Sequence, residues 1–346
     1  MSAKLKKLLK SMSQLNATDL HLSVGSVPRY RISGKIQSSD LGELSSRSIQ
    51  ELFSTFLSKS QTTALRKDKD LAMAFDLEGG DRFRLNLFHQ KGKLGACFRR
   101  IPSEPPGLTV LGLPSEISEV IEYRHGLVLV SGATGSGKTT TIASMLDAIN
   151  KKKRGHIVTL EDPIEYLHPH NKCIVTQREI GTDCLDFETG YRELFRIDPD
   201  YILVGEIRDR ISAETALKLA ESGHLVFGTL HSGGAQQSIS RLISLFEPER
   251  QAHVRELLAV NLKLVVSQML LSGNQGLVLV PEIVKINTAV QNLIRKGQMN
   301  QVYSAMQSSG KNPLMKTFED SVSSLVRSGH LSDRFVGAVA SGGSNG

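Results

Sequence analysis

The sequence of 346 residues contains no tryptophan and only three cysteines. Cys97, Cys173 and Cys184 form no C-x-x-C pair, so the sequence offers neither a zinc knuckle nor a thioredoxin-like redox motif. Sparse cysteine use is typical of a reducing compartment, and we therefore expect a cytoplasmic protein. A chain of this length can bury its own core, which excludes a small fold stapled by disulfides.

Long apolar runs are missing as well. The longest, at residues 126–130 and 276–280, have the length of a strand, whereas a helix needs about 18 apolar residues to span a bilayer. The basic N-terminal stretch AKLKKLLKSMSQL lacks a continuous apolar core, so we expect no signal peptide. The sequence predicts no transmembrane segment.

A proline-rich segment divides the chain. IPSEPPG, at residues 101–107, has three prolines in seven residues, which excludes a helix and indicates a stiff, extended connector. We therefore predict an N-terminal domain over residues 1–101, a linker over 102–107, a second domain over 108–339 and a disordered tail over 340–346.

The two parts differ in their patterns. Residues 1–101 contain short alternating strands around a helical stretch near residues 48–56, which predicts an α+β domain with an antiparallel sheet. After the linker, apolar strands alternate with helical patterns, as in a parallel, doubly wound α/β sheet. The expected strands are 127–130, 157–160, 201–204 and 225–229, and the expected helices are 139–149, 211–221 and 235–245. From residue 247 onward we expect mostly helix, interrupted by GLVLVPEIVKI.

The segment GATGSGKT, residues 132–139, matches the phosphate-binding pattern G-x-x-x-x-G-K-[ST] and lies between an apolar strand and a helix. Lys138 would contact the β- and γ-phosphates of ATP, and Thr139 would ligate Mg²⁺. The glycines let backbone amides wrap the phosphates at the start of the helix. The residues expected to bind the nucleotide are Gly132, Ala133, Thr134, Gly135, Ser136, Gly137, Lys138, Thr139 and Thr140.

Three further segments place acids and histidines at strand ends. Glu206 in DPDYILVGEIRD follows a strand expected next to the P-loop strand, where an acid can hold Mg²⁺ through water or polarise the attacking water. In IVTLEDPIE, Glu161 and Glu165 either orient water or Mg²⁺ or are solvated loop acids. His224 and His231 flank one strand in ESGHLVFGTLHS, each as a γ-phosphate sensor or a structural histidine. Their spacing puts them on opposite faces, which argues against one shared metal.

Together these segments resemble the Walker A, Asp-box, Walker B and His-box motifs of the secretion-superfamily ATPases. More narrowly, the sequence resembles the PilT-like ATPases that power type IV pilus retraction in twitching motility. The likeness continues through NATDLHLSVG, RFRLNLF and FRRIP to AVQNLIRKG near the C-terminus. The resemblance implies a RecA-like P-loop ATPase domain preceded by a smaller PAS-like domain. It also implies a cytoplasmic homohexamer at the inner membrane that hydrolyses ATP and acts on a platform protein to extract pilin.

The resemblance also implies roles for single residues: Glu206 as the Walker B acid, Glu161 and Glu165 as Asp-box acids, His224 and His231 as His-box residues, and Arg84 and Arg99 as arginines that reach the γ-phosphate. In RFRLNLF, apolar and polar residues alternate, so the strand should present Arg82 and Arg84 on its polar face. Without the family, surface arginines are an equally good interpretation. Since Arg99 and Arg100 point in opposite directions on a strand, only one of them should act.

Three positions depart from the family pattern. Ile197 stands where an acidic residue is usual, which removes a charge near an expected subunit contact. In AVQNLIRK, Gln291 and Lys296 replace the Arg and Glu of a motif that the family associates with retraction. These changes leave the nucleotide motifs intact and concern the coupling to the pilus. The same segment can also be interpreted as an amphipathic helix that packs into the core.

Other functions are compatible with these motifs. A pilus-assembly, secretion or DNA-uptake ATPase is one, although the assembly and secretion relatives are longer and often carry a four-cysteine zinc element. The net charge of +7 also suggests a RecA-like nucleic-acid translocase, but the absence of tryptophan and of interleaved aromatic and basic residues argues against bound nucleic acid. The third alternative, a catalytically silent subunit, is disfavoured by Lys138 and Glu206. Residues 1–101 hold 18 Lys+Arg and 9 Asp+Glu, and the remainder holds 24 and 26, so the basic excess lies entirely in the first domain.

Overall fold

The computed structural model describes residues 1–336 except positions 33, 79, 103, 275 and 311. The chain divides into two compact units, Met1–Glu104 and Pro105–Gly346, and this division falls within the proline-rich segment. The expected tail at 340–346 lies outside the described residues. Among the helices of the described residues, none combines the length and the apolar character that crossing a bilayer requires.

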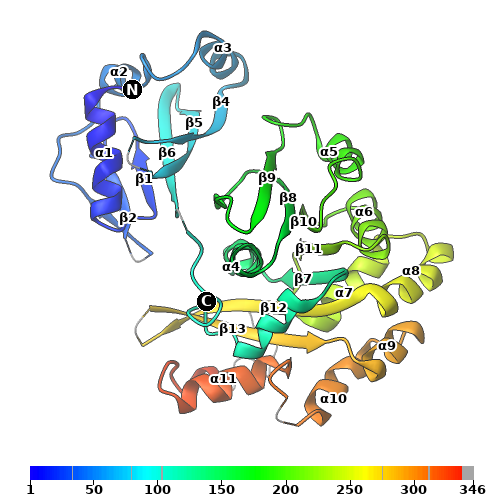
Figure 1. Ribbon diagram of the computed structural model, residues 1–346. Coiled ribbons are helices and arrows are strands. Elements are labelled where there is room, and N and C mark those ends of the chain that lie inside the picture. The colour runs from blue at the N-terminus through cyan, green and yellow to red at the C-terminus, as the bar shows by residue number, and fades with distance from the viewer. Residues whose placement is uncertain (33, 79, 103, 275, 311, 337–346) are drawn as a thin grey trace. The chain divides into compact units, whose positions relative to one another are not determined.

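The first unit contains one six-stranded antiparallel sheet and three helices (Figure 1). Its elements are α1 (Ala3–Gln14), β1 (Asp19–Leu22), β2 (Arg29–Ile32), β3 (Lys35–Ser38), α2 (Ser46–Phe53), α3 (Lys59–Asp68), β4 (Asp70–Asp76), β5 (Arg82–Gln90) and β6 (Lys93–Ile101). The strand order is β3-β2-β1-β6-β5-β4. The expectation of an α+β unit with an antiparallel sheet is confirmed.

Alternating side chains build the core of this unit. On β5, Phe83, Leu85 and Leu87 are buried, while the residues between them face the other side of the sheet. α1 covers the buried side with apolar residues at helical spacing, among them Leu5 and Leu9. α3 was not predicted, because only one residue in its mostly polar sequence is buried.

The second unit is an α/β layer structure around an eight-stranded sheet. Its elements up to the sixth helix are η1 (Ser115–Glu122, a 3₁₀ helix), β7 (Gly126–Ser131), α4 (Lys138–Lys152), β8 (Gly155–Glu161), β9 (Cys173–Glu179), α5 (Phe187–Leu194), β10 (Tyr201–Glu206) and α6 (Arg210–Glu221). The remaining elements are β11 (Leu225–Leu230), α7 (Ala235–Ser244), α8 (Pro248–Asn261), β12 (Leu262–Gly273), β13 (Gly276–Lys285), α9 (Thr288–Arg295), α10 (Asn300–Ser308), β14 (Met315–Lys316) and α11 (Phe318–Arg327).

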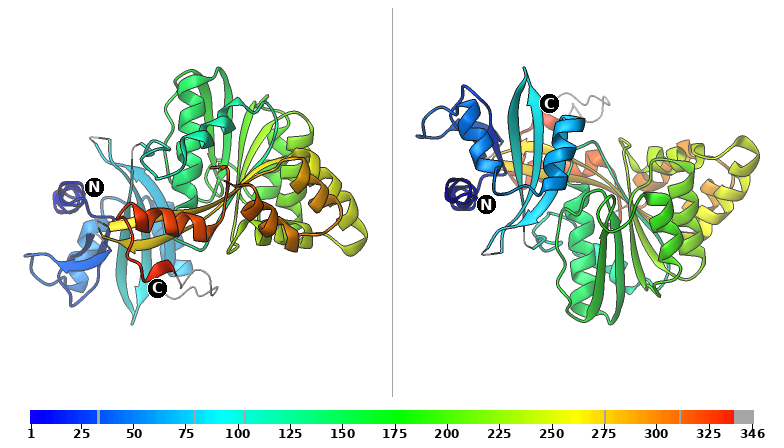
Figure 2. Two further views of the ribbon diagram at one scale, coloured as in Figure 1. Left: turned by 90° about the horizontal axis from the view of Figure 1, so that it is seen from below. Right: turned by 90° about the horizontal axis from the view of Figure 1, so that it is seen from above.

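The strand order of this sheet is β14-β13-β12-β7-β11-β10-β8-β9. The six strands from β12 to β9 are parallel, and β13 and β14 join antiparallel at one edge. Apolar residues of α4 and η1 pack on one face, and those of α5 to α10 pack on the other (Figure 2). The predicted parallel, doubly wound sheet is therefore confirmed, with an antiparallel extension.

One part of the prediction was wrong. Residues 262–273 were expected to be mostly helical, yet they form β12, which pairs with β7 in the middle of the sheet. A strand buried on both faces is a nearly continuous apolar run without alternation, so its sequence resembles that of a buried helix. β9, the strand at the other edge, was not anticipated either.

Candidate active site

The P-loop connects the end of β7 to the start of α4 in the second unit. Gly132, Gly135 and Gly137 have φ values of 148°, 78° and 88°, which side chains rarely allow. A Cβ on Gly132 would also lie 2.3 Å from the carbonyl oxygen of Gln268 and 2.4 Å from Ser136 Oγ. The loop can therefore take this tight path only with glycine at these positions.

Lys138 is the first residue of α4, and its side chain is buried against the loop. Its Nζ donates to the carbonyl oxygens of Gly132 and Ala133, each at 2.9 Å. Burial lowers the pKa of Lys138, while the nearby carboxylates of Glu206 and Glu165 act in the opposite direction. The amine is thus held at the loop and within the field of two acids.

The polar atoms around the loop are suited to a nucleotide phosphate and Mg²⁺. Within the described part of the chain, Ser136 Oγ is buried without a hydrogen-bond partner, and the Thr139 hydroxyl forms no hydrogen bond. Hydroxyl and carboxylate oxygens are the donors that Mg²⁺ prefers. The donor set of Thr139 and Glu206 fits this ion, and the loop with Lys138 fits a phosphate.

Gln268 of β12 fixes the loop to the helix and was not predicted as a site residue. Its Nε2 donates to the Ser136 carbonyl oxygen at 2.7 Å, and its Oε1 accepts from Thr141 Oγ1 at 2.9 Å. The side chain is only 2% exposed. In the sequence, Gln268 is a single amide side chain inside an apolar run. Its contact with the P-loop follows only from the position of β12 beside β7.

Glu206 and His231 form the second part of the site. Glu206 ends β10, His231 follows β11, and His231 Nε2 lies 3.4 Å from Glu206 Oε1. The prediction that β10 lies next to β7 was wrong, because β11 lies between them. This order brings His231 to the carboxyl edge of the sheet, between the P-loop strand and the strand of the acid. Ligands of open α/β sheets usually bind at that edge.

Glu161 ends β8, and Glu165 follows this strand at the same edge. Glu161 is 7% exposed and accepts hydrogen bonds from Thr159 Oγ1 at 2.6 Å and Gln177 Nε2 at 3.1 Å. Burial raises the pKa of Glu161 to about 7, and the charge of Glu165 adds to this shift. Glu165 itself is exposed. The structure thus brings both acids to the edge of the sheet that carries Lys138, Glu206 and His231.

The structure does not bring His224 to this edge. His224 precedes β11, and a regular strand separates its two ends by roughly 3.3 Å per residue, so His224 lies at the amino edge. Its Nδ1 is 3.0 Å from both Ser222 Oγ and the Leu219 carbonyl oxygen, at the end of α6. These contacts support the structural interpretation of His224 rather than a role beside the phosphates.

Arg84 and Arg99 belong to the first unit. They are direct cross-strand partners on β5 and β6, and side chains of opposed residues share a face of the sheet. Arg99 Nε donates to Asp19 Oδ1 at 2.9 Å. Arg84 forms neither a hydrogen bond nor an ion pair within the residues that the structure describes. The role expected of both arginines at a γ-phosphate remains a prediction.

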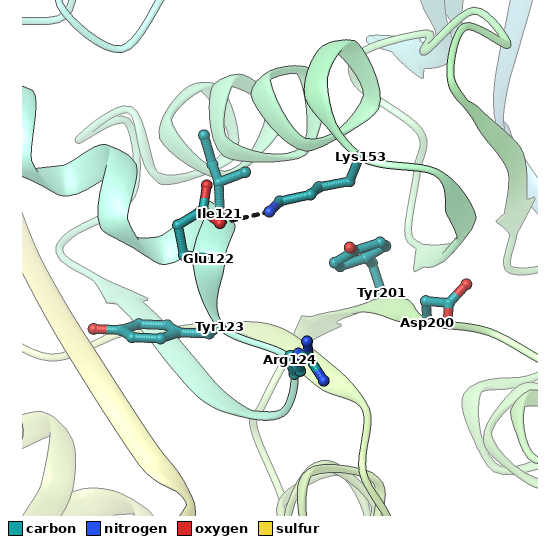
Figure 3. Close-up of a pocket in the computed structure, with 7 residues that line it drawn as sticks. All are labelled: Ile121, Glu122, Tyr123, Arg124, Lys153, Asp200 and Tyr201. Atoms are coloured by element: carbon teal, nitrogen blue, oxygen red, sulfur yellow. Dashed lines mark hydrogen bonds and ion pairs between the residues drawn. The ribbon is translucent and has the colours of Figure 1, made fainter.

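A pocket of about 460 Å³ lies at the opposite, amino edge of the sheet (Figure 3). Its wall includes Arg124 before β7, Tyr201 at the start of β10 and Lys153 after α4, and the Lys153 ammonium group pairs with Glu122 at 2.6 Å. Because the P-loop and the acids lie at the carboxyl edge, this pocket is separate from the candidate active site.

Known proteins provide an independent comparison. The family model described as "Type II/IV secretion system protein" matches residues 111–330. The type IV pilus retraction ATPase PilT of Pseudomonas aeruginosa is 40% identical over 94% of this chain and 95% of its own length. The type IV pilus ATPase PilU of the same organism is 34% identical over 94% of this chain and 85% of its own length.

A solved structure is similar over nearly the same extent. The crystal structure of the pilus retraction motor PilT with bound ADP superposes with a TM-score of 0.89 at 41% identity, covering 96% of this chain and 95% of that one. The match therefore extends over both units. This chain belongs to the type II/IV secretion system protein family.

Proposed function

We propose that this chain is a motor ATPase that hydrolyses ATP to drive type IV pilus retraction. The observation that carries the proposal is the meeting of Lys138, Glu206 and His231 at one sheet edge, in a chain that resembles a retraction ATPase from end to end. A P-loop alone would suit many nucleotide-binding proteins. The paired acid and histidine beside it suit hydrolysis.

In the proposed reaction, a water oxygen attacks the γ-phosphorus in line, the bond to the β–γ bridging oxygen breaks, and ADP leaves. Lys138 would hold the β- and γ-phosphates, and Glu206 would orient the attacking water, with His231 holding its carboxylate in place. Mg²⁺, held by Thr139 directly and by Glu206 through water, would neutralise the phosphate charge. Glu161 and Glu165 would assist at the water, and Arg84 and Arg99 would stabilise charge at the γ-phosphate.

We further infer a homohexameric ring at the cytoplasmic face of the inner membrane, where ATP-driven motion of the two units acts on a platform protein. Nearly full-length similarity to PilT supports this assignment. No bound nucleic acid is expected. Pilus assembly is the alternative within the family. The type IV pilus ATPase PilU is also similar to this chain, so the sequence pattern is not confined to PilT.

A deletion strain distinguishes these possibilities. If the chain drives retraction, the strain should carry surplus surface pili and lose twitching, and a plasmid copy should restore motility whereas the Glu206→Gln copy should not. The measurements are pilus counts by electron microscopy and the width of the twitching zone. Cells without pili would show an assembly role, and unchanged pili and motility would contradict both.

A further inference from the structure

Glu282 on β13 is a buried carboxylate that no predicted motif includes. It is 5% exposed, and its Oε1 accepts a 2.6 Å hydrogen bond from the backbone amide of Ala235, the first residue of α7. The backbone amide of Phe318, the first residue of α11, also favours its charged form. One side chain on the sheet therefore accepts from a buried backbone amide at the start of α7 that has no partner within the helix.

The start of α7 depends on this carboxylate. Its N-cap residue is Gly234, which provides no side-chain hydrogen bond, whereas most caps use Ser, Thr, Asp or Asn. A Cβ on Gly234 would lie 2.3 Å from Gln237 Oε1 and 3.1 Å from Glu282 Oε1. Glycine thus leaves room for the distant carboxylate to act as the cap.

The segment that Glu282 holds begins at the active site. His231 contacts Glu206, and only Ser232, Gly233 and Gly234 separate His231 from α7. Two glycines make this connection flexible by themselves. The position of His231 therefore depends on how the far end of the segment is anchored.

Buried hydroxyl groups link the same segment to the P-loop strand. Ser232 Oγ lies 2.7 Å from Ser238 Oγ, which lies 2.7 Å from Ser131 Oγ at the end of β7. Ser131 Oγ in turn lies 2.5 Å from Ser267 Oγ on β12, and Ser267 is the register partner of Glu282. The Glu282 carboxylate thus holds the start of α7, and the serine hydroxyls hold Ser232 and α7 against β7 and β12.

Burying this carboxylate costs free energy of folding. Burial, together with the nearby charge of Glu319, raises the pKa of Glu282 to about 7. An apolar residue on β13 would avoid this desolvation. Residues that lower the stability of the fold are commonly found at positions where function requires them.

We propose that Glu282 is a positioning residue for ATP hydrolysis: it anchors the start of α7 and so keeps His231 on Glu206. The inference rests on the ATPase site proposed above. Glu282 touches neither the nucleotide loop nor the reacting atoms, so its effect should fall on turnover and not on nucleotide binding.

Three variants test this role. Glu282→Ala removes the acceptor, Glu282→Gln keeps an acceptor oxygen for the Ala235 amide, and Asn287→Ala is the matched control. Asn287 caps α9 in the same unit by accepting from the Val290 amide at 3.0 Å, and this cap does not involve α7. Amide hydrogen exchange of residues 231–240 and the kcat and KM for ATP are measured on the full chain.

For Glu282→Ala we expect at least about tenfold faster exchange at the Ala235 amide and about tenfold lower kcat, with KM within about twofold of the wild type. Glu282→Gln should stay within about threefold of the wild type in both readouts, and Asn287→Ala should leave both unchanged. The inference is overturned if Glu282→Ala behaves like the wild type, if a higher KM accounts for the loss, or if Asn287→Ala has the same effect.

Two further comparisons cover the cases in which Glu282→Ala does not fold or the wild-type chain does not hydrolyse ATP. If Glu282→Ala does not fold, Glu282→Asp, whose carboxylate is one methylene shorter, withdraws the acceptor from the Ala235 amide and should change exchange and kcat in the same direction; wild-type values there would overturn the inference. If the wild-type chain does not hydrolyse ATP, the proposed function fails, but exchange at residues 231–240 still decides whether Glu282 anchors them.

Discussion

Glu161 is a carboxylic acid held almost entirely out of water at the end of β8. Its pKa of about 7 lies above its ordinary value of 4.5, so between these values the folded state binds a proton that the unfolded chain has released. The contribution of this group to stability is therefore complete below pH 4.5 and is lost as the pH rises through 7. A shift of this size corresponds to about 3 kcal/mol.

The variant Glu161→Gln should reveal this shift. The amide oxygen can still accept from Thr159 and Gln177, but the side chain does not ionise, so the variant should gain stability over the wild type at pH 8 and not at pH 5. Thermal unfolding without nucleotide at both pH values measures the difference in Tm. Glu282 titrates in the same range, but it is common to both proteins. An equal difference in Tm at both pH values would contradict the assigned shift.

Gln268 allows a second test, on nucleotide binding. Gln268→Ala leaves the Ser136 carbonyl oxygen and the Thr141 hydroxyl without their partner, and a lost buried hydrogen bond costs about 1–3 kcal/mol. We expect nucleotide affinity to fall about tenfold or more, measured by titration with a fluorescent ATP analogue. Gln268→Glu, which keeps the acceptor for Thr141, separates the two contacts. Unchanged affinity in Gln268→Ala would show that the loop holds its shape without this residue.

The site residues predicted from the sequence lie in short contiguous motifs, in which the spacing of the residues is enough to indicate their chemistry. Lys138, Glu206 and His231 are of this kind, and the structure brings them to one edge. Gln268 and Glu282 come from a hairpin far along the chain, and their contacts exist only because β12 lies beside β7. The structural interpretation of His224 is supported for a related reason, since the ends of one strand lie at opposite edges of the sheet.

The strands and helices show the same division between local and distant information. Surface helices such as α6, and the half-buried strand β5, were predictable because one face is apolar and the other polar. β12 was not, because central burial removes that contrast. The place of β11 between β7 and β10 is a property of the whole sheet, and no single segment of sequence encodes it.

The register of β5 and β6 predicts different effects for the two arginines. Arg84 and Arg99 face the same side, but Arg99 is engaged by Asp19. If these arginines act at the γ-phosphate, Arg84→Ala should lower kcat about 10³-fold, in the range of arginine fingers, while nucleotide affinity stays within about threefold. Arg99→Ala should have the smaller effect on kcat. Arg84→Ala turnover close to that of the wild type would exclude the role.

The charge of the chain is divided between its units. The basic excess in residues 1–101 is expected if this part supplies arginines to phosphates bound by a neighbouring subunit. A ring built this way has composite sites, and composite sites can be tested by mixing inactive variants.

We expect Arg84→Ala and Glu206→Gln chains, each inactive alone, to regain activity when mixed as monomers and reassembled. In a random 1:1 ring, about a quarter of the neighbouring pairs would combine an intact Glu206 with an intact Arg84 from the next subunit. The measurement is ATP turnover of the mixture, with each variant alone as the control. A mixture without activity, despite native masses that show mixed rings, would place the arginine and the acid within one subunit.

ATP turnover and nucleotide binding of the purified chain test the proposed ATPase most directly, with Glu206→Gln and Lys138→Ala beside the wild type. We predict that the wild type releases phosphate from ATP, that Glu206→Gln binds the nucleotide with turnover at least about 10²-fold lower, and that Lys138→Ala loses binding as well. Turnover that persists in both variants, or a wild type that binds ATP without hydrolysing it, would contradict the assignment of this sheet edge as a hydrolytic site.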